Sequence, residues 1–170
     1  MISEEIAARL TGLVTTATQY CALVEQSADY ERDEWIKRIV IALPALYIGV
    51  QSLSLEDVPT LDDGGYLAEY VDEILYEKVR RSTAALLGED DVYLETFEED
   101  MKYSDTPIAA TISEGIADIF QSVYNYVGVA RDSDGDLLGD AFRELKESFE
   151  TYWSQTLCNT LRALNALLRQ

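Results

Sequence analysis

The chain has 170 residues, of which 48% are hydrophobic and 26% charged, a balance that predicts one folded domain over 1–170 rather than a disordered segment. It contains no histidine, which excludes a catalytic triad with a histidine base and the Glu-x-x-His di-iron sites of ferritin-like bundles. Its net charge of −19 would repel a phosphate backbone, so direct nucleic-acid binding is not expected.

Two helices are predicted in the first third of the chain. Ser3 can cap a helix over residues 4–26, in which apolar residues recur at steps of three and four. A second helix is predicted over residues 32–51, and its second half is apolar nearly all round. Because Pro44 removes a backbone donor from this helix, we expect a kink or a break near residues 40–43.

Acidic residues concentrate in the middle of the chain. Residues 52–105 hold 16 acids and 4 bases, a net −12 of the total −19. Within this region a loop is predicted over residues 52–65 and a third helix over residues 72–87, ending at Gly88. The stretch that follows, about residues 88–106, is predicted to be an acidic connector, inside which a short helical turn or an extended piece can form.

Two further helices are predicted in the C-terminal part. Thr106 and Pro107 are typical of a helix start, with a cap followed by proline, so the fourth helix is expected to run from there to about residue 130. A last, long helix is expected from about residue 136 to residue 168. No strand of useful length is predicted. The fold class is therefore all-α, a single up-and-down bundle of about five helices, or six if Pro44 splits the second.

The segment RDSDGDLLGDAF, residues 131–142, invites comparison with a calcium-binding loop. With Asp132 in the first position of an EF-hand loop, acids also occupy the third and fifth positions. The sixth position, however, holds Leu137 instead of glycine, and the twelfth holds Arg143 instead of a bidentate glutamate. We therefore predict no metal site and assign these aspartates to capping of the helix that follows.

A candidate cleft is centred on the fourth helix. Asp118 stands at the edge of its apolar stripe, where Arg80 and Arg81 of the third helix could pair with the carboxylate. This arrangement is either a structural salt bridge or part of a functional cleft. The residues that would form the cleft are Arg80, Arg81, Tyr93, Glu114, Asp118 and Trp153.

The acidic middle supports a first functional hypothesis, that the protein is a non-enzymatic adaptor without a cofactor, which binds a protein partner with a basic surface. The N-terminus lacks the basic flank and apolar stretch of a secretory signal, and no apolar run is long enough to span a bilayer, so we expect a cytoplasmic protein with no membrane attachment. Its oligomeric state is not predicted. The docking surface would consist of Glu95, Glu98, Glu99 and Asp100.

The alternative hypothesis is a magnesium-dependent nucleotide phosphohydrolase of the MazG type, built on carboxylates alone. Enzymes of that type hold magnesium with paired acids three residues apart on neighbouring helices. Here Glu95 with Glu98 and Glu69 with Asp72 have that spacing, although the pairs stand in the reverse order.

Three segments, YEKVRRSTAALLGEDDVYLETF (76–97), ISEGIADIFQSVYNYVG (112–128) and YWSQTLCNTLRALNALL (152–168), together resemble the bacterial DUF5063 family. The family pattern on the fourth helix is Ser, a variable residue, then Asp-Leu-Ala-Asp-Ile-Tyr. Here Ser113 and Asp118 match it, whereas Gly115 replaces an acid and Phe120 replaces a tyrosine. The resemblance implies a helical fold and a bacterial source, but no reaction.

Overall fold

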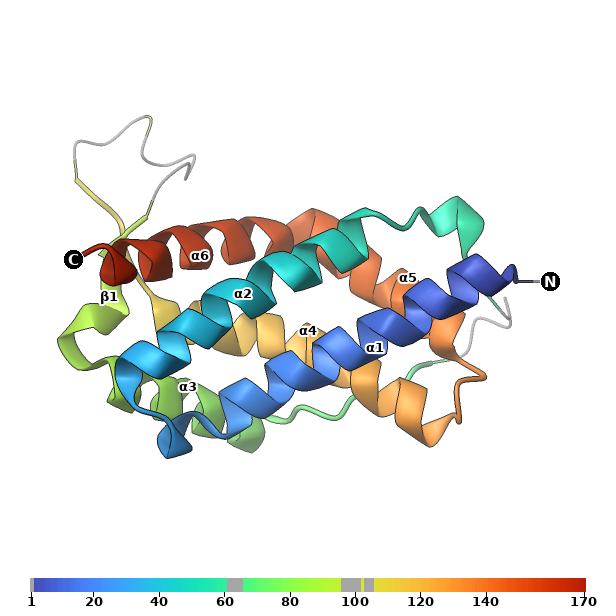
Figure 1. Cartoon of the computed structure of the whole chain (residues 1–170), viewed down its shortest axis with the longest axis horizontal. Coiled ribbons are helices and arrows are strands. Elements are labelled where there is room, and N and C mark those ends of the chain that lie inside the picture. Colours follow the sequence, from blue (N-terminus) through green and yellow to red (C-terminus); the bar gives the residue numbers. More distant parts are fainter. Residues whose placement is uncertain (1, 61–65, 96–101, 103–105) are drawn as a thin grey trace.

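The computed structural model describes residues 2–60, 66–95, 102 and 106–170, and its described part is predominantly helical (Figure 1). The predicted all-α bundle with a long C-terminal helix is confirmed. In chain order the helices are α1 (Glu4–Glu25), α2 (Arg32–Gln51), α3 (Glu73–Leu87), α4 (Ile112–Asp132), α5 (Leu138–Ser148) and α6 (Ser154–Leu168).

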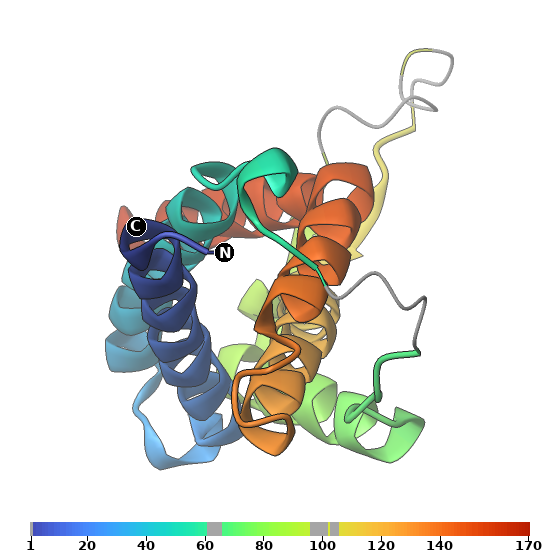
Figure 2. The ribbon, with the colours of Figure 1, turned by 90° about the vertical axis from the view of Figure 1, so that its right-hand side faces the viewer.

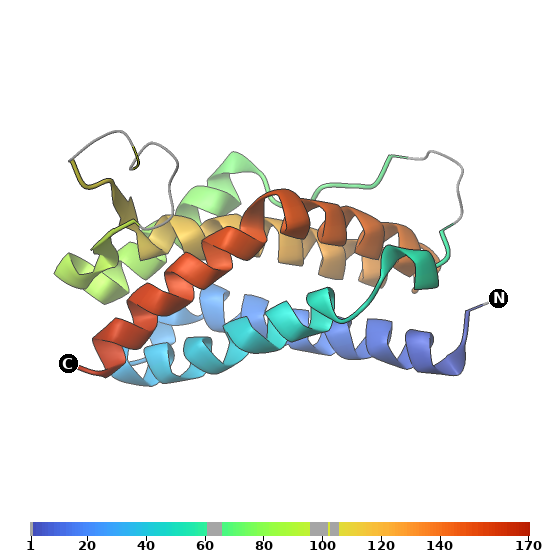
Figure 3. The ribbon, with the colours of Figure 1, turned by 90° about the horizontal axis from the view of Figure 1, so that it is seen from above.

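The helices pack in two layers around one hydrophobic core. Seen from above, α1 and α2 form one layer, α4 and α5 form the other, and α6 crosses from the second towards the first (Figure 3). The view along the bundle shows the same division, with α1 and α2 on one side and α5 on the other (Figure 2). None of the helices in the described residues is long and apolar enough to cross a membrane.

Helix α4 is the centre of the packing, because it contacts α1, α3, α5 and α6. Its apolar face, which includes Ile116 and Phe120, is fully buried. Two buried tyrosines also tie α1 to α4: the Tyr20 hydroxyl donates to the carbonyl of Ile116 at 2.8 Å, and the Tyr126 hydroxyl donates to the carbonyl of Leu10 at 3.1 Å. Each phenol thereby satisfies its own polar group and a carbonyl inside the core.

Helix α2 runs without a break through Pro44, so the break considered for residues 40–43 does not occur. A proline inside a helix costs about 3 kcal/mol through the lost hydrogen bond and the ring clash. The buried side of α2 compensates, since Ile39, Leu43 and Leu46 are completely inaccessible to solvent and each contributes about 1.5–3 kcal/mol on burial.

The C-terminal end of α2 is capped by a buried lysine from α5. The Lys146 ammonium group donates to the carbonyls of Val50 and Gln51 at 3.0 and 3.2 Å. Because the last carbonyls of a helix lack partners and carry partial negative charge, a cation at this place satisfies them and complements the helix dipole.

The acidic connector contains both a helical turn and an extended piece, the two kinds of element considered for it. Residues Gly88–Asp91 form a 3₁₀ turn, and strand β1 (Val92–Leu94) pairs antiparallel with β2 (Ala109–Thr111). Three-residue strands are too short to produce an alternating pattern in the sequence, which is why they are not predicted. Residues 96–101 and 103–105 of the connector lie outside the described residues.

The predicted start of the fourth helix at Thr106 and Pro107 is wrong, because α4 begins only after Thr111. Thr111 caps the helix through a hydrogen bond from a backbone N–H of the first turn. The buried carboxylate of Asp91 adds a second anchor, accepting from the backbone N–H of Ser113 at 2.7 Å and from its hydroxyl at 2.6 Å. These interactions, together with strand pairing, place the helix start later than the proline signal suggests.

The predicted C-terminal helix is a long rod with one irregularity. Residues Phe149–Trp153 form a π-helical turn between α5 and α6, and α6 leaves this turn in a different direction from α5 (Figure 3). A π turn inserts one extra residue per turn and therefore rotates the side chains that follow it relative to a regular helix.

The aspartates of residues 131–142 do not cap α5, contrary to the prediction. Leu137 occupies the cap position without a side-chain bond, and its N–H donates to the Ser133 hydroxyl at 3.2 Å. Asp132 instead accepts from the Tyr70 hydroxyl at 2.7 Å and pairs with Arg131 at 2.9 Å.

Candidate functional site

A cleft of about 410 Å³ opens between the first half of α4, the start of α6 and the β1–β2 pair. Its lining combines carboxylates, phenols and side-chain amides. Among the described residues that line it, none is a lysine or an arginine. Its chemically informative residues are Glu95, Glu114, Asp118, Tyr93, Tyr152, Gln155 and Asn159.

The carboxylate of Asp118 is fixed by two phenols that come from different parts of the chain. The Tyr76 hydroxyl on α3 donates to one carboxylate oxygen at 2.6 Å, and the Tyr152 hydroxyl in the π turn donates to the other at 2.7 Å. Each carboxylate oxygen has two lone pairs and can therefore accept a further hydrogen bond from a ligand. The network holds a negative charge in a defined orientation at the cleft.

The phenols of the cleft remain protonated donors at neutral pH. Burial, and then the hydrogen bond to Asp118, raise the pKa of Tyr152 to about 12. Burial and the neighbouring Glu95 raise the pKa of Tyr93 to about 12, and burial followed by the bond to Asp118 also raises the pKa of Tyr76. These tyrosines are therefore suited to hydrogen bonding and stacking and not to acting as bases.

The floor of the cleft is formed where α4 and α6 approach closely at Gly115. A Cβ atom at this position would lie 2.2 Å from the hydroxyl oxygen of Thr160, which is fully buried. A side chain at Gly115 therefore requires Thr160 to change its side-chain conformation or one of the helices to shift.

The structure brings together three of the six residues predicted to form a cleft. Glu114, Asp118 and Tyr93 line it. Arg80 and Arg81 do not: both pair with Glu77 on their own helix, at 2.9 and 3.3 Å, and the expected salt bridge to Asp118 is absent. Pairing at spacings of three and four along a helix is local and satisfies the arginines without a contact to α4.

Trp153 does not line the cleft but lies in the core. Its side chain is fully buried, its ring N–H donates to the Ser148 hydroxyl at 3.1 Å, and its ring packs edge-to-face on Phe149. The preceding residue, Tyr152, lies at the cleft instead.

Sequence reasoning missed Tyr76 and the face of the C-terminal rod that lines the cleft. Tyr152, Gln155, Thr156 and Asn159 follow one another at steps of three, one and three. This spacing is typical of a single helix face and was a usable signal. Nothing in the sequence paired that face with Asp118, because the pairing depends on how α6 crosses α4.

The predicted acidic docking surface is only partly described. Glu95 borders the cleft and accepts from the Tyr93 hydroxyl at 3.3 Å. Glu98, Glu99 and Asp100 lie outside the described residues.

The acids assigned to the magnesium hypothesis occupy different environments. Glu69 lies in a segment without regular secondary structure before α3, and Asp72 caps α3 by accepting from the N–H of Leu75 at 2.8 Å. Glu98 is outside the described residues, so the relative placement of all four acids is not described. Within the described ranges, no group of three or more His, Cys, Asp or Glu could hold a metal ion.

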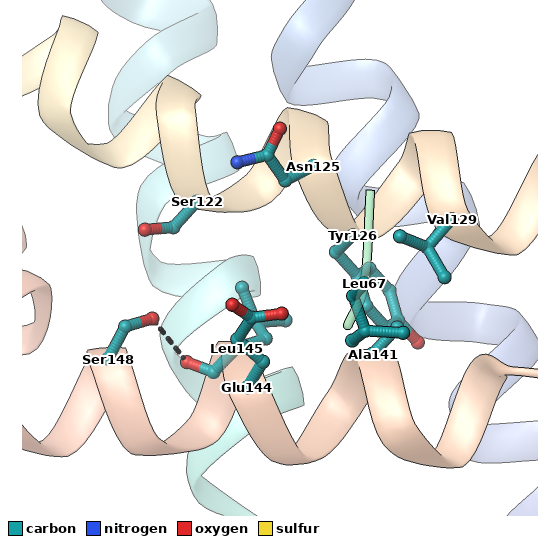
Figure 4. Close-up of a pocket in the computed structure, with 9 residues that line it drawn as sticks. All are labelled: Leu67, Ser122, Asn125, Tyr126, Val129, Ala141, Glu144, Leu145 and Ser148. Carbon is teal, nitrogen blue, oxygen red and sulfur yellow. Dashed lines mark hydrogen bonds between the residues drawn. The ribbon is translucent and has the colours of Figure 1, made fainter. Parts of the chain in front are cut away.

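A second, smaller cavity of about 100 Å³ lies between α4 and α5 under Leu67 (Figure 4). The Glu144 carboxylate lies in the gap between these helices, and its pKa is raised by burial and then by the negative charges of Glu69 and Glu147. The segment that covers the cavity is held down by Asn125, whose side-chain oxygen accepts from the backbone N–H of Tyr70 at 2.7 Å. A space of this size holds a few waters and not a ligand.

The family model for DUF5063, a domain of unknown function, matches residues 4–170. The chain belongs to the DUF5063 family. A crystal structure of protein BF1032 from Bacteroides fragilis is similar to this DUF5063 chain, with a TM-score of 0.77 and 28% sequence identity over 91% of this chain and 89% of that one. None of the curated proteins matches the sequence significantly.

Ser113 and Asp118, the two residues of the fourth helix that match the DUF5063 pattern, both take part in hydrogen bonds between elements. Ser113 binds the buried Asp91 at the start of α4, and Asp118 receives the two phenols in the cleft. Gly115 is the position at which a Cβ atom would overlap the Thr160 hydroxyl.

Proposed function

We propose that this DUF5063 protein is a non-enzymatic, cytoplasmic interaction protein that binds a partner with a basic surface, and that the cleft receives an arginine side chain of that partner. The observation that carries the proposal is the composition of the cleft. Carboxylates of Glu95, Glu114 and Asp118 stand beside the phenol rings of Tyr93 and Tyr152. A guanidinium group pairs with carboxylates through its planar fork of donors and stacks on aromatic rings, so it suits both kinds of lining.

The charge of the whole chain supports the same reading. Residues 52–105, which include strand β1 at the cleft, carry −12 of the net −19. Such a concentration of negative charge attracts a basic surface over several ångströms and raises the rate of encounter.

The protonation of the site favours binding over catalysis. The chain has no histidine, and the phenols at the cleft have raised pKa values, which makes them poor bases at neutral pH. The oriented Asp118 carboxylate offers a fixed acceptor for a cationic group.

Calorimetric titration with an arginine-rich peptide tests the proposal. We expect the double variant Glu114→Gln/Asp118→Asn to bind about tenfold more weakly than the wild type. The matched control is Asp134→Asn/Asp136→Asn, which removes the same charge from the exposed turn between α4 and α5 and should retain the affinity. Equal weakening by both pairs would mean that only net charge matters and would contradict a specific cleft.

The magnesium phosphohydrolase stays a prediction and is separated from the adaptor by a thermal-shift experiment. A ligand that binds only the folded state raises the melting temperature. If the adaptor proposal holds, Mg²⁺ with a nucleoside triphosphate leaves the melting temperature unchanged, whereas the arginine-rich peptide raises it. The reverse pattern would favour the enzyme.

A further inference from the structure

Helices α1 and α2 lie side by side and present one broad face of the bundle (Figure 1). This face is unusual in its charge. Residues 10–24 of α1 and residues 39–55, which cover most of α2, contain no Asp, Glu, Lys or Arg, although these types make up 26% of the chain. The rest of this strongly acidic molecule therefore surrounds a neutral surface.

The neutral face also contains a groove. A groove of about 490 Å³ runs between the two helices, and its central lining is Thr16, Gln19, Ala22, Ile41, Ala42 and Ala45. Arg38 stands at one end, where it is paired with Glu34 at 3.0 Å. Ile41, which borders the groove, and Ile48, farther along α2, have 73% and 65% of their surfaces exposed.

Single exposed apolar residues are common and need no explanation. Ile41 and Ile48, however, stand two turns apart on one helix face with Ala45 between them, and all three are exposed. Covering these isoleucines removes apolar surface from water, which favours association.

We propose that a second copy of this chain covers the face, forming a two-fold symmetric dimer through α1 and α2. Two molecules that each carry −19 repel one another, and contact through the uncharged residues is the arrangement that brings the fewest acids together. Helix α3, in the acidic middle of the chain, packs on the inner side of the turn between α1 and α2 and does not line the groove.

The shape of the face fits an interface of this symmetry. A two-fold contact uses the same surface on both molecules, so that surface must offer a projection and a recess together. Ile41 and Ile48 are the projections and the groove is the recess, on one face. A basic partner, by contrast, would gain no charge pairing from uncharged residues.

The area of the face limits the surface that the dimer can bury. At about 1.5 Å rise per residue and about 10 Å between helix axes, the uncharged parts of α1 and α2 cover on the order of 20 by 20 Å. Stable interfaces bury roughly 800 Å² on each partner, so this smaller face predicts reversible association that depends on concentration.

Sedimentation equilibrium of the full chain tests the dimer. From about 1 µM to about 500 µM protein, the average mass should rise from 19.1 kDa towards twice that value. Added sodium chloride should strengthen the association, because it screens the repulsion between the two acidic molecules. A mass that stays at 19.1 kDa at every concentration and salt level would overturn the proposal.

Matched variants locate the interface. Ile41→Glu and Ile48→Glu place a charge on exposed positions and should abolish the rise in mass while leaving the helical circular-dichroism signal intact. The control is Ile74→Glu on α3, where the isoleucine is 80% exposed but lies outside the face; it should associate like the wild type. If Ile74→Glu weakens association as much as Ile41→Glu, the α1–α2 face is not the interface.

Discussion

At the residue scale, Asp118 shows how a side chain can be both ordered and available. Its two oxygens accept from Tyr76 on α3 and from Tyr152 in the π turn. The position of the Asp118 carboxylate therefore depends on how α3, α4 and the π turn pack together. Lone pairs that remain on both oxygens can still bind a cation. The same acid without its tyrosines would be a mobile surface charge of little specificity.

Glu144 has the opposite environment, because negative neighbours and burial disfavour its charge. Its pKa in the folded protein is raised above the ordinary 4.5, so the destabilisation is fully present above the raised pKa and disappears below about 4.5. We expect Glu144→Gln to raise the melting temperature by about 1–2 °C near pH 7 and to give no gain near pH 4.

Melting curves of both proteins at the two pH values check this prediction. The control is Glu56→Gln, which changes an exposed glutamate in the short 3₁₀ helix after α2 and should leave the melting temperature unchanged. A gain of the same size at both pH values would show that packing, and not charge, explains the effect of Glu144→Gln.

At the element scale, the close approach of α4 and α6 decides the shape of the cleft floor. Gly115→Ala should lower the free energy of unfolding by about 1–3 kcal/mol, because the new methyl group would overlap the Thr160 hydroxyl. In a Thr160→Ala background the overlap is gone. There the same substitution should be neutral or stabilising by up to about 1 kcal/mol, since alanine favours helix more than glycine does.

Chemical denaturation of the wild type, the two single variants and the double variant completes this cycle. The free energies should be strongly non-additive. If Gly115→Ala destabilises equally with and without Thr160, the contact between these two positions does not determine the spacing of the helices.

The long helices could be predicted from the sequence, whereas their irregularities could not. Apolar periodicity and the caps at Ser3 and Gly88 locate α1, α2 and α3 to within a residue or two. The start of α4 was misplaced because the local signal of Pro107 is outweighed by strand pairing and by Asp91, which are contacts between distant residues. The π turn carries no composition signal of its own.

The candidate site was predictable only in part, for the same reason. Glu114 and Asp118 were recognised from the predicted fourth helix, and Tyr93, from the predicted connector, was placed in the same cleft. The partners of Asp118 were wrongly assigned to arginines, because opposite charge is the obvious sequence signal, whereas the phenols that bind it come from α3 and the π turn. Which residue of the Tyr152–Trp153 pair faces the cleft depends on the rotation introduced by that turn.

At the scale of the whole molecule, charge divides the surface into regions with opposite salt behaviour. Binding of a basic partner at the cleft should weaken as salt rises, because screening removes the attraction. Self-association through the neutral α1–α2 face should strengthen, because screening removes a repulsion. The two processes can therefore be measured separately in one salt titration.

The most direct test of the central claim, that the cleft is a binding site for a basic protein, is quantitative affinity purification from the native host. The baits are the wild type, Glu114→Gln/Asp118→Asn and the charge-matched Asp134→Asn/Asp136→Asn. We predict that a basic protein is enriched by the wild type and by the matched control, and is lost with the cleft variant. Recovery of the same proteins in the same amounts by all three baits would contradict the account.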